Sequence, residues 1–352
     1  MNDVRYTYNK TLEGYKNGEV DMNFMRMRDK YVTRKNNFKN VPEWLIKTPK
    51  NVRAGACQDL VTAFKAATTN FVKNNISNFD LKYKTKKNGN SIVIPSTTIK
   101  IQEGKKKVKI FPEFLTPIKL SNDKILNKIN NISDSRIYHK HGIWTLGISY
   151  KKKEINNKVV DRTIALDPGV MTFQTGYSKD DIFKCQQDNS RFDKLNKRKD
   201  KLHSLAKEGK IKYSSYRKTE KSINRKADNL IDDLHFKTIA HLQSNYDNIL
   251  LPSFDSQEMA KKGYSRKTNR SMISLKHYLF KSRLMEKCGK NKNCKLHIVS
   301  EAWTTKTCTG CGVINKKVKC SDRELHCRSC FISTDRDVSG SRNVFLRNIN
   351  LC

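Results

Sequence analysis

The sequence has few acidic residues and no long apolar segment. It holds 34 Asp and Glu residues against 71 Lys and Arg residues, which leaves a formal net charge of +37 over 352 residues. No stretch approaches the ~20 consecutive apolar residues of a membrane-spanning helix. The start of the chain also lacks the apolar core of a signal peptide. These absences predict a protein that neither crosses a membrane nor is secreted, so its ten cysteines are expected in a reducing compartment.

The excess of basic residues predicts a polyanionic partner. Self-repulsion of this size weakens the compact state unless a partner compensates it. Phosphates neutralise Lys and Arg, and the release of counterions drives association. A lysine-rich bias of the genome is the alternative, and it suffices for any single exposed lysine. Dense basic runs at 105–107, 151–153 and 194–226 favour nucleic acid, and Tyr213 and Tyr216 within the last run could stack on bases.

Hydrophobic periodicity divides the chain into segments of different character. Residues 1–78 read as helical because apolar residues recur every three to four positions. Residues 79–160 hold short β-like runs, among them 81–83, 92–94, 108–111 and 143–148, which predict a small sheet. Residues 161–300 alternate buried strands with long basic helices, which indicates an α/β core. A cysteine-rich segment, 301–333, and a final helix, 334–352, follow.

Four cysteines have the spacing of a zinc site. Cys308-x2-Cys311 and Cys327-x2-Cys330 are separated by fifteen residues. Each pair places two thiolates on one tight turn, and two such turns complete a closed tetrahedral site. A closed site predicts a structural zinc ribbon. The zinc would either only stabilise the local fold or also support a basic insertion that contacts nucleic acid. The other cysteines show no ligand pattern and are expected to be ordinary thiols: Cys57, Cys185, Cys288, Cys294, Cys320 and Cys352.

Acidic residues stand at the ends of the predicted strands. Asp167 closes the strand at 163–166, Glu301 follows the strand at 296–299, and Asp335 and Asp337 begin the last helix. Phosphodiester cleavage by two metal ions needs carboxylates that converge from separate elements, and Mg²⁺ prefers such oxygen ligands. The alternative is structural, because Asp167 precedes Pro-Gly as a turn residue would and Asp335 could cap the helix.

At these residues the sequence resembles the TnpB/OrfB and Fanzor proteins. Leu166-Asp167-Pro168-Gly169 resembles their first RuvC motif. The segments 300–312 and 335–344 are similar to their Thr-Ser-Lys-x-Cys-x-x-Cys-Gly and Asp-Arg-Asp-x-Asn-x-Ala-x-Asn-Ile motifs. The order of the motifs matches over most of the chain. The resemblance implies an α/β fold, with a RuvC-like RNase H-fold nuclease core that carries an inserted four-cysteine zinc ribbon. An N-terminal helical region and a small β domain would precede the core.

The resemblance also implies an activity, that of an RNA-guided DNA endonuclease of a transposable element. Asp167, Glu301 and Asp337 would bind catalytic Mg²⁺, with Asp335 the weaker candidate of its pair. A guide RNA from the transposon end would lie on residues 1–160, and double-stranded DNA would be the target. Two alternatives remain: a transposase that acts on element ends without a guide RNA, and a nucleic-acid-binding protein whose catalysis has decayed. The oligomeric state stays open.

Departures from the family pattern favour the Fanzor branch, which comprises eukaryotic and giant-virus proteins. TnpB proteins usually carry their glutamate where this chain reads Leu250-Leu251-Pro252-Ser253-Phe254, whereas many Fanzors carry it where Glu301 stands. Asp255 and Glu258 are the second-choice candidates for this metal-binding acid. A Fanzor-like protein is expected in the nucleus or a viral factory, and otherwise in the cytoplasm of a bacterium. Ser339 and Ser341 replace the usual Asn and Ala, and the place of 8–12 in the family pattern predicts a shortened N-terminus.

Overall fold

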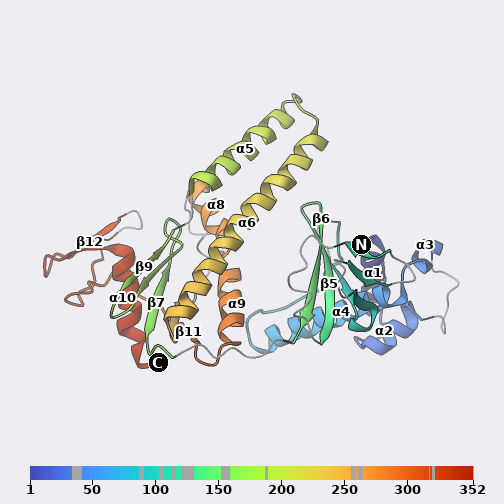
Figure 1. Ribbon diagram of the computed structural model, residues 1–352, viewed down its shortest axis with the longest axis horizontal. Coiled ribbons are helices and arrows are strands. Elements are labelled where there is room, and N and C mark those ends of the chain that lie inside the picture. Colours follow the sequence, from blue (N-terminus) through green and yellow to red (C-terminus); the bar gives the residue numbers. More distant parts are fainter. Residues whose placement is uncertain are drawn as a thin grey trace. The chain divides into compact units, whose positions relative to one another are not determined.

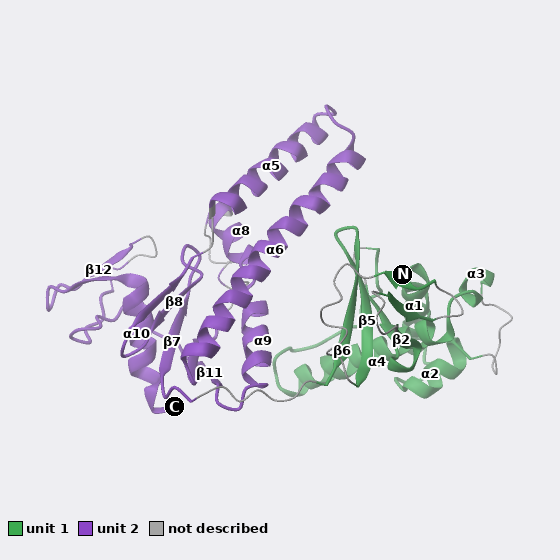
Figure 2. Cartoon of the chain, in the orientation of Figure 1, with its two compact units in different colours: residues 1–152 green, residues 153–352 purple. Residues whose placement is uncertain are grey.

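The computed structural model describes most of the chain as two compact units, residues 1–152 and 153–352 (Figure 2). The described residues are 1–33, 42–86, 91–102, 107–111, 116–119, 131–151, 159–186, 189–254, 259, 265–316, 318 and 322–351. Within them, no helix combines the length and the apolar character that crossing a membrane would require.

Four helices form one part of the first unit: α1 (Asn2–Lys16), α2 (Phe24–Tyr31), α3 (Glu43–Ile46) and α4 (Lys50–Val72) (Figure 1). The Asn23 side chain caps α2 by accepting hydrogen bonds from the amides of Met25 and Arg26. α1 and α2 pack on α4, and Leu12, Met27 and Leu60 are fully buried between them. The apolar stripes read from the sequence are therefore the faces that build this core.

Short antiparallel strands complete the first unit. One sheet has the order β1 (Ser91–Ile94), β5 (Ile132–Lys140), β6 (Ile143–Tyr150). The other has the order β2 (Ile99–Gln102), β3 (Lys107–Ile110), β4 (Ile118–Lys119), and the 3-10 turn η2 (Ser96–Thr98) joins β1 to β2. Ile94, Val108 and Ile110 of these strands share one hydrophobic core with the helices. The positive φ angles of His141 and Gly142 give the two-residue turn of the β5–β6 hairpin.

The β-like run at 81–83 is a wrong prediction, because the structure forms no strand there. The chain lies along α1 instead. The Asn9 side chain donates to the carbonyl of Lys84 at 3.0 Å and accepts from its amide at 2.7 Å. One amide side chain thus satisfies the backbone groups that a neighbouring strand would have paired.

A five-stranded sheet is the centre of the second unit. Its order is β11 (Lys295–Val299), β10 (Asn248–Pro252), β7 (Thr163–Pro168), β8 (Gln174–Tyr177), β9 (Ile182–Cys185). β7, β8 and β9 form an antiparallel meander, whereas β10 runs parallel to both β7 and β11. The carboxyl ends of β7, β10 and β11 therefore meet at one edge of the sheet, and this edge positions the candidate site.

Helices cover both faces of this sheet. Ile164 and Leu166 of β7 belong to a core with α6 (Tyr213–Asn245) and α9 (His277–Cys288). Ala165, between them in the strand, faces the other way and packs with Val344 and Phe345 of α10 (Arg336–Asn348), which the turn η4 (Ile349–Leu351) follows. This alternation explains why β7 is apolar on both faces up to Asp167.

The basic region expected as one helical stretch is a helical hairpin. α5 (Asn189–Lys207) and the first half of α6 lie side by side and extend beyond the sheet (Figure 1). Gly209 makes the turn between them with a φ of 72°. The second half of α6 returns to the sheet through the buried residues Ile231, Ile239 and Leu242. α8 (Arg266–Ser274) precedes α9.

Candidate functional site

Asp167 lies at the carboxyl end of β7, where its side chain meets α10. An ideal Cβ built on Gly340 of α10 would lie 2.7 Å from Oδ2 of Asp167 and 3.3 Å from its Cγ. Any larger residue at position 340 would therefore have to displace the carboxylate or the helix. The glycine gives the carboxylate its room against the helix, so Asp167 is more than the turn residue that its Pro-Gly neighbours would suggest.

The other two predicted carboxylates, Asp337 and Glu301, act on Asp167 through their charge. Burial, followed by the negative charges of Asp337 and Glu301, raises the pKa of Asp167 from 3.8 to about 8. The positive charge of Arg336 acts in the opposite direction. A buried carboxylate beside two like charges retains its proton well above the usual range, unless a cation offsets the repulsion.

Glu301 stands two residues beyond the end of β11, on a loop that α10 holds in place. Nδ2 of Asn343 donates to the carbonyls of Thr304 and Thr307, each at 2.8 Å. Nη1 of Arg347 donates to the carbonyl of Ala302 at 2.6 Å. Sequence reasoning missed these two supporting residues, although Asn343 stands within the last of the three motifs and its place there was a usable signal.

The structure gives Asp335 and Asp337 different positions at the start of α10. Oδ1 of Asp335 accepts from the amides of Asp337 at 2.9 Å and Val338 at 3.0 Å, so Asp335 caps α10. Its Oδ2 accepts from Nζ of Lys184 at 2.7 Å. Burial opposes the shift, but these hydrogen bonds and the lysine charge lower the pKa of Asp335 overall. Asp337 lies in the first turn of α10. Its Oδ1 is 3.4 Å from Nη2 of Arg336, and its Oδ2 is 3.9 Å from Nη1 of Arg323.

β10 contributes no acidic side chain at this edge among its described residues. Pro252 ends the strand opposite Val299 of β11, and the next described residues are Ser253 and Phe254. Asp255 and Glu258, the second-choice candidates, lie outside the described residues.

A buried aromatic stack under this edge was also missed from the sequence. Phe173 lies between His235 of α6 and His277 of α9, with ring centroids 5.1 Å from each. Burial lowers the pKa of both histidines to about 4, so both rings are neutral. The carbonyl of Phe173 accepts from the amide of Gly169 at 3.3 Å, which links the stack to the turn after Asp167. Isolated histidines in a sequence give no sign of such a stack.

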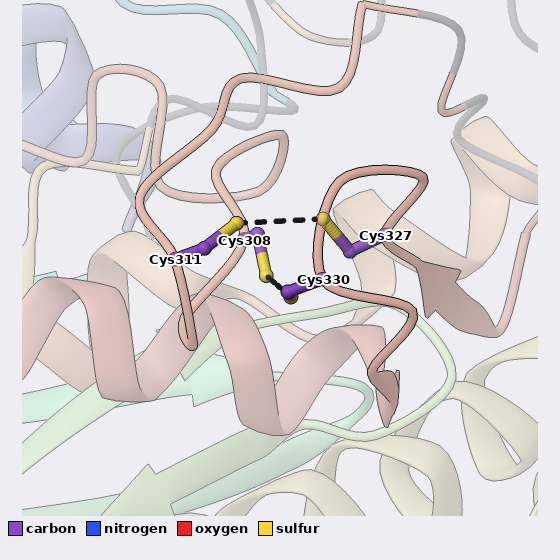
Figure 3. Close-up of side chains that lie close together, drawn as sticks. All are labelled: Cys308, Cys311, Cys327 and Cys330. Atoms are coloured by element: carbon purple, nitrogen blue, oxygen red, sulfur yellow. Dashed lines mark hydrogen bonds between the residues drawn. The ribbon is translucent and has the colours of Figure 1, made fainter.

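The four predicted zinc ligands converge in space (Figure 3). All their sulfur atoms lie within 4.8 Å of one another, with Cys308 to Cys330 at 3.6 Å and Cys311 to Cys327 at 3.5 Å. A tetrahedral zinc with bonds of about 2.3 Å requires sulfur separations of roughly 3.8 Å. Among the side chains that the structure describes, this cluster is the compact group able to share one metal ion.

Local backbone structure prepares the cysteines for a metal. Amide hydrogen bonds from Cys330 and Ser329 lower the pKa of the Cys327 thiol to about 6, which favours the thiolate. Gly310 allows the close packing of the first turn against the second, because a Cβ there would lie 2.6 Å from Cδ1 of Ile332 and displace that side chain. The turns thus supply the close approach that a four-cysteine site needs and, at Cys327, one thiol that readily loses its proton.

The remaining described cysteines are thiols without a metal cluster. Cys57 is buried in the first unit, and Cys185 lies 3.0 Å from the hydroxyl of Thr238. Cys288 and Cys294 are buried with their sulfur atoms 3.3 Å apart. Cys320 and Cys352 lie outside the described residues.

The α5–α6 hairpin carries most of the basic run at 194–226. Lys194, Lys197, Arg198 and Lys201 are exposed on α5. Tyr213 is exposed and lies beside Arg217. The expectation that Tyr216 stacks on bases is wrong, because its ring is buried between the helices and its hydroxyl donates to Glu220 at 2.9 Å. Of the other basic runs, only Lys107 and Lys151 lie within the described residues.

The comparisons with known proteins agree with this arrangement. Residues 277–344 match the family model "Cas12f1-like, TNB domain". A putative transposase of Paramecium bursaria Chlorella virus 1 is 27% identical, over 98% of this chain and 81% of the viral protein. A TnpB-like protein of Acanthamoeba polyphaga mimivirus is 24% identical over 80% of this chain, which spans 54% of that longer relative.

A solved structure shows the same fold. The Cas12f1 chain in a cryo-EM structure of a Cas12f1-sgRNA-target DNA complex superposes with a TM-score of 0.55, at 14% identity. The match covers 97% of this chain and 80% of the Cas12f1 chain. The relatives and the family model show that this chain is similar to TnpB-like proteins of giant viruses and to the Cas12f1-like TNB domain, and its α/β fold with a four-cysteine cluster superposes on Cas12f1.

Proposed function

We propose that this chain is an RNA-guided DNA endonuclease of a transposable element. The observation that supports the proposal is the buried carboxylate of Asp167 at the end of β7, which packs against Gly340 of α10 and is subject to the negative charges of Asp337 and Glu301. Their repulsion acts together with burial to raise the pKa of Asp167. Repelling carboxylates are costly to keep together, and a cation-dependent function is the physical reason to keep them.

The three carboxylates fit magnesium by the chemistry of their donor atoms. They offer the hard oxygen ligands that Mg²⁺ prefers, and a divalent cation would offset the repulsion around Asp167. When bound, Mg²⁺ activates water and stabilises the leaving oxygen of a phosphodiester. The chain itself supplies the positioning: Gly340 leaves room for Asp167, and Asn343 holds the loop of Glu301. Asp335 caps α10 and so orients the turn that carries Asp337.

The four cysteines are proposed to hold a structural zinc ion. They complete a closed set of thiolates with no position for substrate, so the metal stabilises the ribbon and takes no part in cleavage.

Guide RNA and double-stranded DNA are the proposed partners. The net charge of +37 and the exposed cations of α5 supply phosphate contacts. Residues 1–78 and 79–160 are assigned to guide RNA, with the nuclease core at 161–300, the ribbon at 301–333 and the last motif at 334–352. The giant-virus relatives and the position of Glu301 support the Fanzor branch, and with it a nuclear or viral-factory location.

Copurification from cells that carry the gene with its native flanking DNA tests this function. Bound RNA is sequenced, and DNA that matches its 3′ end is then offered with Mg²⁺. The expected result is a discrete RNA, and cutting that Asp167→Ala abolishes. Asp335→Asn is the matched control, because the amide oxygen still caps α10, so this variant is expected to cut. The absence of both bound RNA and cutting would reject the guided nuclease.

Two alternatives have their own outcomes in this experiment. The viral relative named as a putative transposase favours the first, a protein that binds and joins element ends without RNA. Binding of element ends by the RNA-free protein, followed by strand joining, would establish it. The second is a decayed nucleic-acid-binding protein, and it predicts that Asp167→Ala leaves every measurable activity unchanged.

A further inference from the structure

The two cysteine turns of the ribbon make the same backbone hydrogen bonds. In the first turn the amide of Gly312 donates to the carbonyl of Cys308 at 2.9 Å. In the second turn the amide of Phe331 donates to the carbonyl of Cys327 at 3.0 Å. Each turn closes with one more bond of 2.9 Å, from Cys308 N to Val313 O and from Cys327 N to Ile332 O. Gly312 and Phe331 therefore occupy equivalent positions.

This position requires left-handed backbone, with a φ of 76° at Gly312 and 60° at Phe331. Glycine adopts this conformation without cost, whereas a bulky residue is strained in it. Phe331 is also 87% exposed, so packing does not offset the strain. Phe111 shows the contrast, because it is equally left-handed but buried in the core of the first unit.

Trp303, close to Glu301 in the chain, also combines left-handed backbone with an exposed aromatic side chain. Its φ is 69°, its side chain is 64% exposed, and it stands two residues after Glu301. The carbonyl of Trp303 accepts from the amide and hydroxyl of Thr307 at 3.1 and 2.8 Å, so hydrogen bonds of the loop fix this backbone. Apart from these aromatics, the left-handed non-glycine residues in the described chain are Asn74, Asn131, His141, Asp161 and Lys276.

The surroundings of Phe331 carry three cationic and two acidic side chains and adjoin the candidate nuclease site. Phe331 lines a groove of the ribbon, together with the cationic side chains of Lys316, Arg323 and Arg328 and the acidic ones of Asp322 and Glu324. Nη1 of Arg323 lies 3.9 Å from Oδ2 of Asp337. A strand whose phosphates contact these cations would thus pass close to the carboxylates.

We propose that Phe331 and Trp303 stack on unpaired bases of the strand that the carboxylates cut. An exposed aromatic ring beside arginines is the arrangement that binds single strands, because every base offers a flat face to the ring and a phosphate to the cation. In a duplex those faces are covered by neighbouring bases, so the stacking selects a single strand. The inference rests on the proposed function, since it takes Asp167, Glu301 and Asp337 as the cutting site.

Phe331→Gly is a direct test, because glycine is the residue that the equivalent turn uses. The zinc-loaded full chain is titrated, without Mg²⁺, against a fluorescent single-stranded oligonucleotide and against its duplex, and anisotropy is recorded. Removal of one stacked ring is expected to weaken single-strand binding about 10-fold and to leave duplex binding unchanged. Phe331→Tyr, which keeps the ring, is expected to bind like the wild type.

The fold itself provides the control for this variant. Relief of strain predicts that Phe331→Gly retains its zinc and unfolds at the same or a higher temperature. Equal single-strand affinity of Phe331→Gly and the wild type would overturn the proposal. So would an equal loss for duplex and single strand, because that result would assign the groove to phosphate binding alone.

Trp303 gives a second, independent readout. In a Trp44→Phe, Trp144→Phe background it is the one remaining tryptophan of the three. Its fluorescence is expected to be quenched by the single strand and not by the duplex, and the absence of quenching would contradict its stacking. Since no step requires Mg²⁺, a wild-type protein that stacks but never cuts would reject the proposed nuclease and leave the binding result intact.

Discussion

Replacement of Asp167 by asparagine is expected to stabilise the protein while abolishing its proposed activity. Asparagine has nearly the size of aspartate but carries no charge, so it removes both the cost of burying a charge and the repulsion with Asp337 and Glu301. The pKa of Asp167 rises from 3.8 in the unfolded chain to about 8 in the fold. At about 1.4 kcal/mol for each pH unit, complete ionisation of Asp167 costs the folded state up to ~6 kcal/mol.

The sign of the effect follows from proton binding. The folded state binds the proton of Asp167 more tightly than the unfolded state, so this contribution to stability is complete below pH 3.8 and disappears as the pH rises toward 8. Asp167→Asn lacks this pH dependence. Its advantage in the free energy of unfolding should therefore be near zero at pH 4 and approach ~5 kcal/mol at pH 8, an upper bound because the structure can relax.

Urea unfolding of the zinc-loaded, magnesium-free protein between pH 5 and pH 8 measures this difference. Trp303 fluorescence, in the background without Trp44 and Trp144, reports on the second unit. Added Mg²⁺ is expected to stabilise the wild type and not the variant, since only the wild type keeps the full set of carboxylates. Asp335→Asn should behave oppositely and lose stability above pH 4, because the pKa of Asp335 is lowered in the fold. An Asp167→Asn advantage that is constant across this pH range would refute the raised pKa of Asp167, and with it the burial of this carboxylate beside the charges of Asp337 and Glu301.

Three further predictions concern the support of the site. Gly340→Ala places a methyl group 2.7 Å from Oδ2 of Asp167. It should reduce the rate of DNA cleavage at least about 10-fold, which corresponds to ~1.4 kcal/mol at the transition state. The control variant Ser339→Ala, on the same helix, should cut DNA like the wild type. Asn343→Ala removes two hydrogen bonds to the loop of Glu301. It should lower the free energy of unfolding of the second unit by about 2–3 kcal/mol in urea titrations. An unchanged unfolding midpoint would show that other contacts hold the loop. Cys311→Ser should release the zinc ion measured by elemental analysis, while Cys320→Ser should retain it, and zinc retained in Cys311→Ser would contradict the assigned ligand set.

The zinc ligands could be predicted from the sequence because their geometry is largely local. Two residues between paired cysteines close a tight turn wherever the pair occurs, and the structure needed only to bring two such turns together. The positions of the strand-end carboxylates could also be predicted from the sequence, because an apolar run that stops at an acidic residue indicates the end of a buried strand. β7, with Ile164, Ala165 and Leu166 buried before Asp167, is that pattern.

Only the tertiary structure decided among residues with the same local signals. The choice of Asp335 as the helix cap depends on the path of the chain into α10 and on Lys184, which arrives from β9. The burial of Tyr216 depends on how α5 lies against α6, and the pairing of Lys84 with Asn9 replaced an expected strand.

The remaining features required contacts between segments far apart in the chain. The room that Gly340 gives Asp167, and the hold of Asn343 on the loop of Glu301, join elements whose meeting depends on the order of the whole sheet. The sequence by itself determined which side chains could bind metal ions, because ligand chemistry belongs to residue type and short spacing. The tertiary structure alone decided that the Asp167 carboxylate is buried against Gly340 and that Phe331 has strained backbone and an exposed side chain, because burial and dihedral angle are properties of the packed chain.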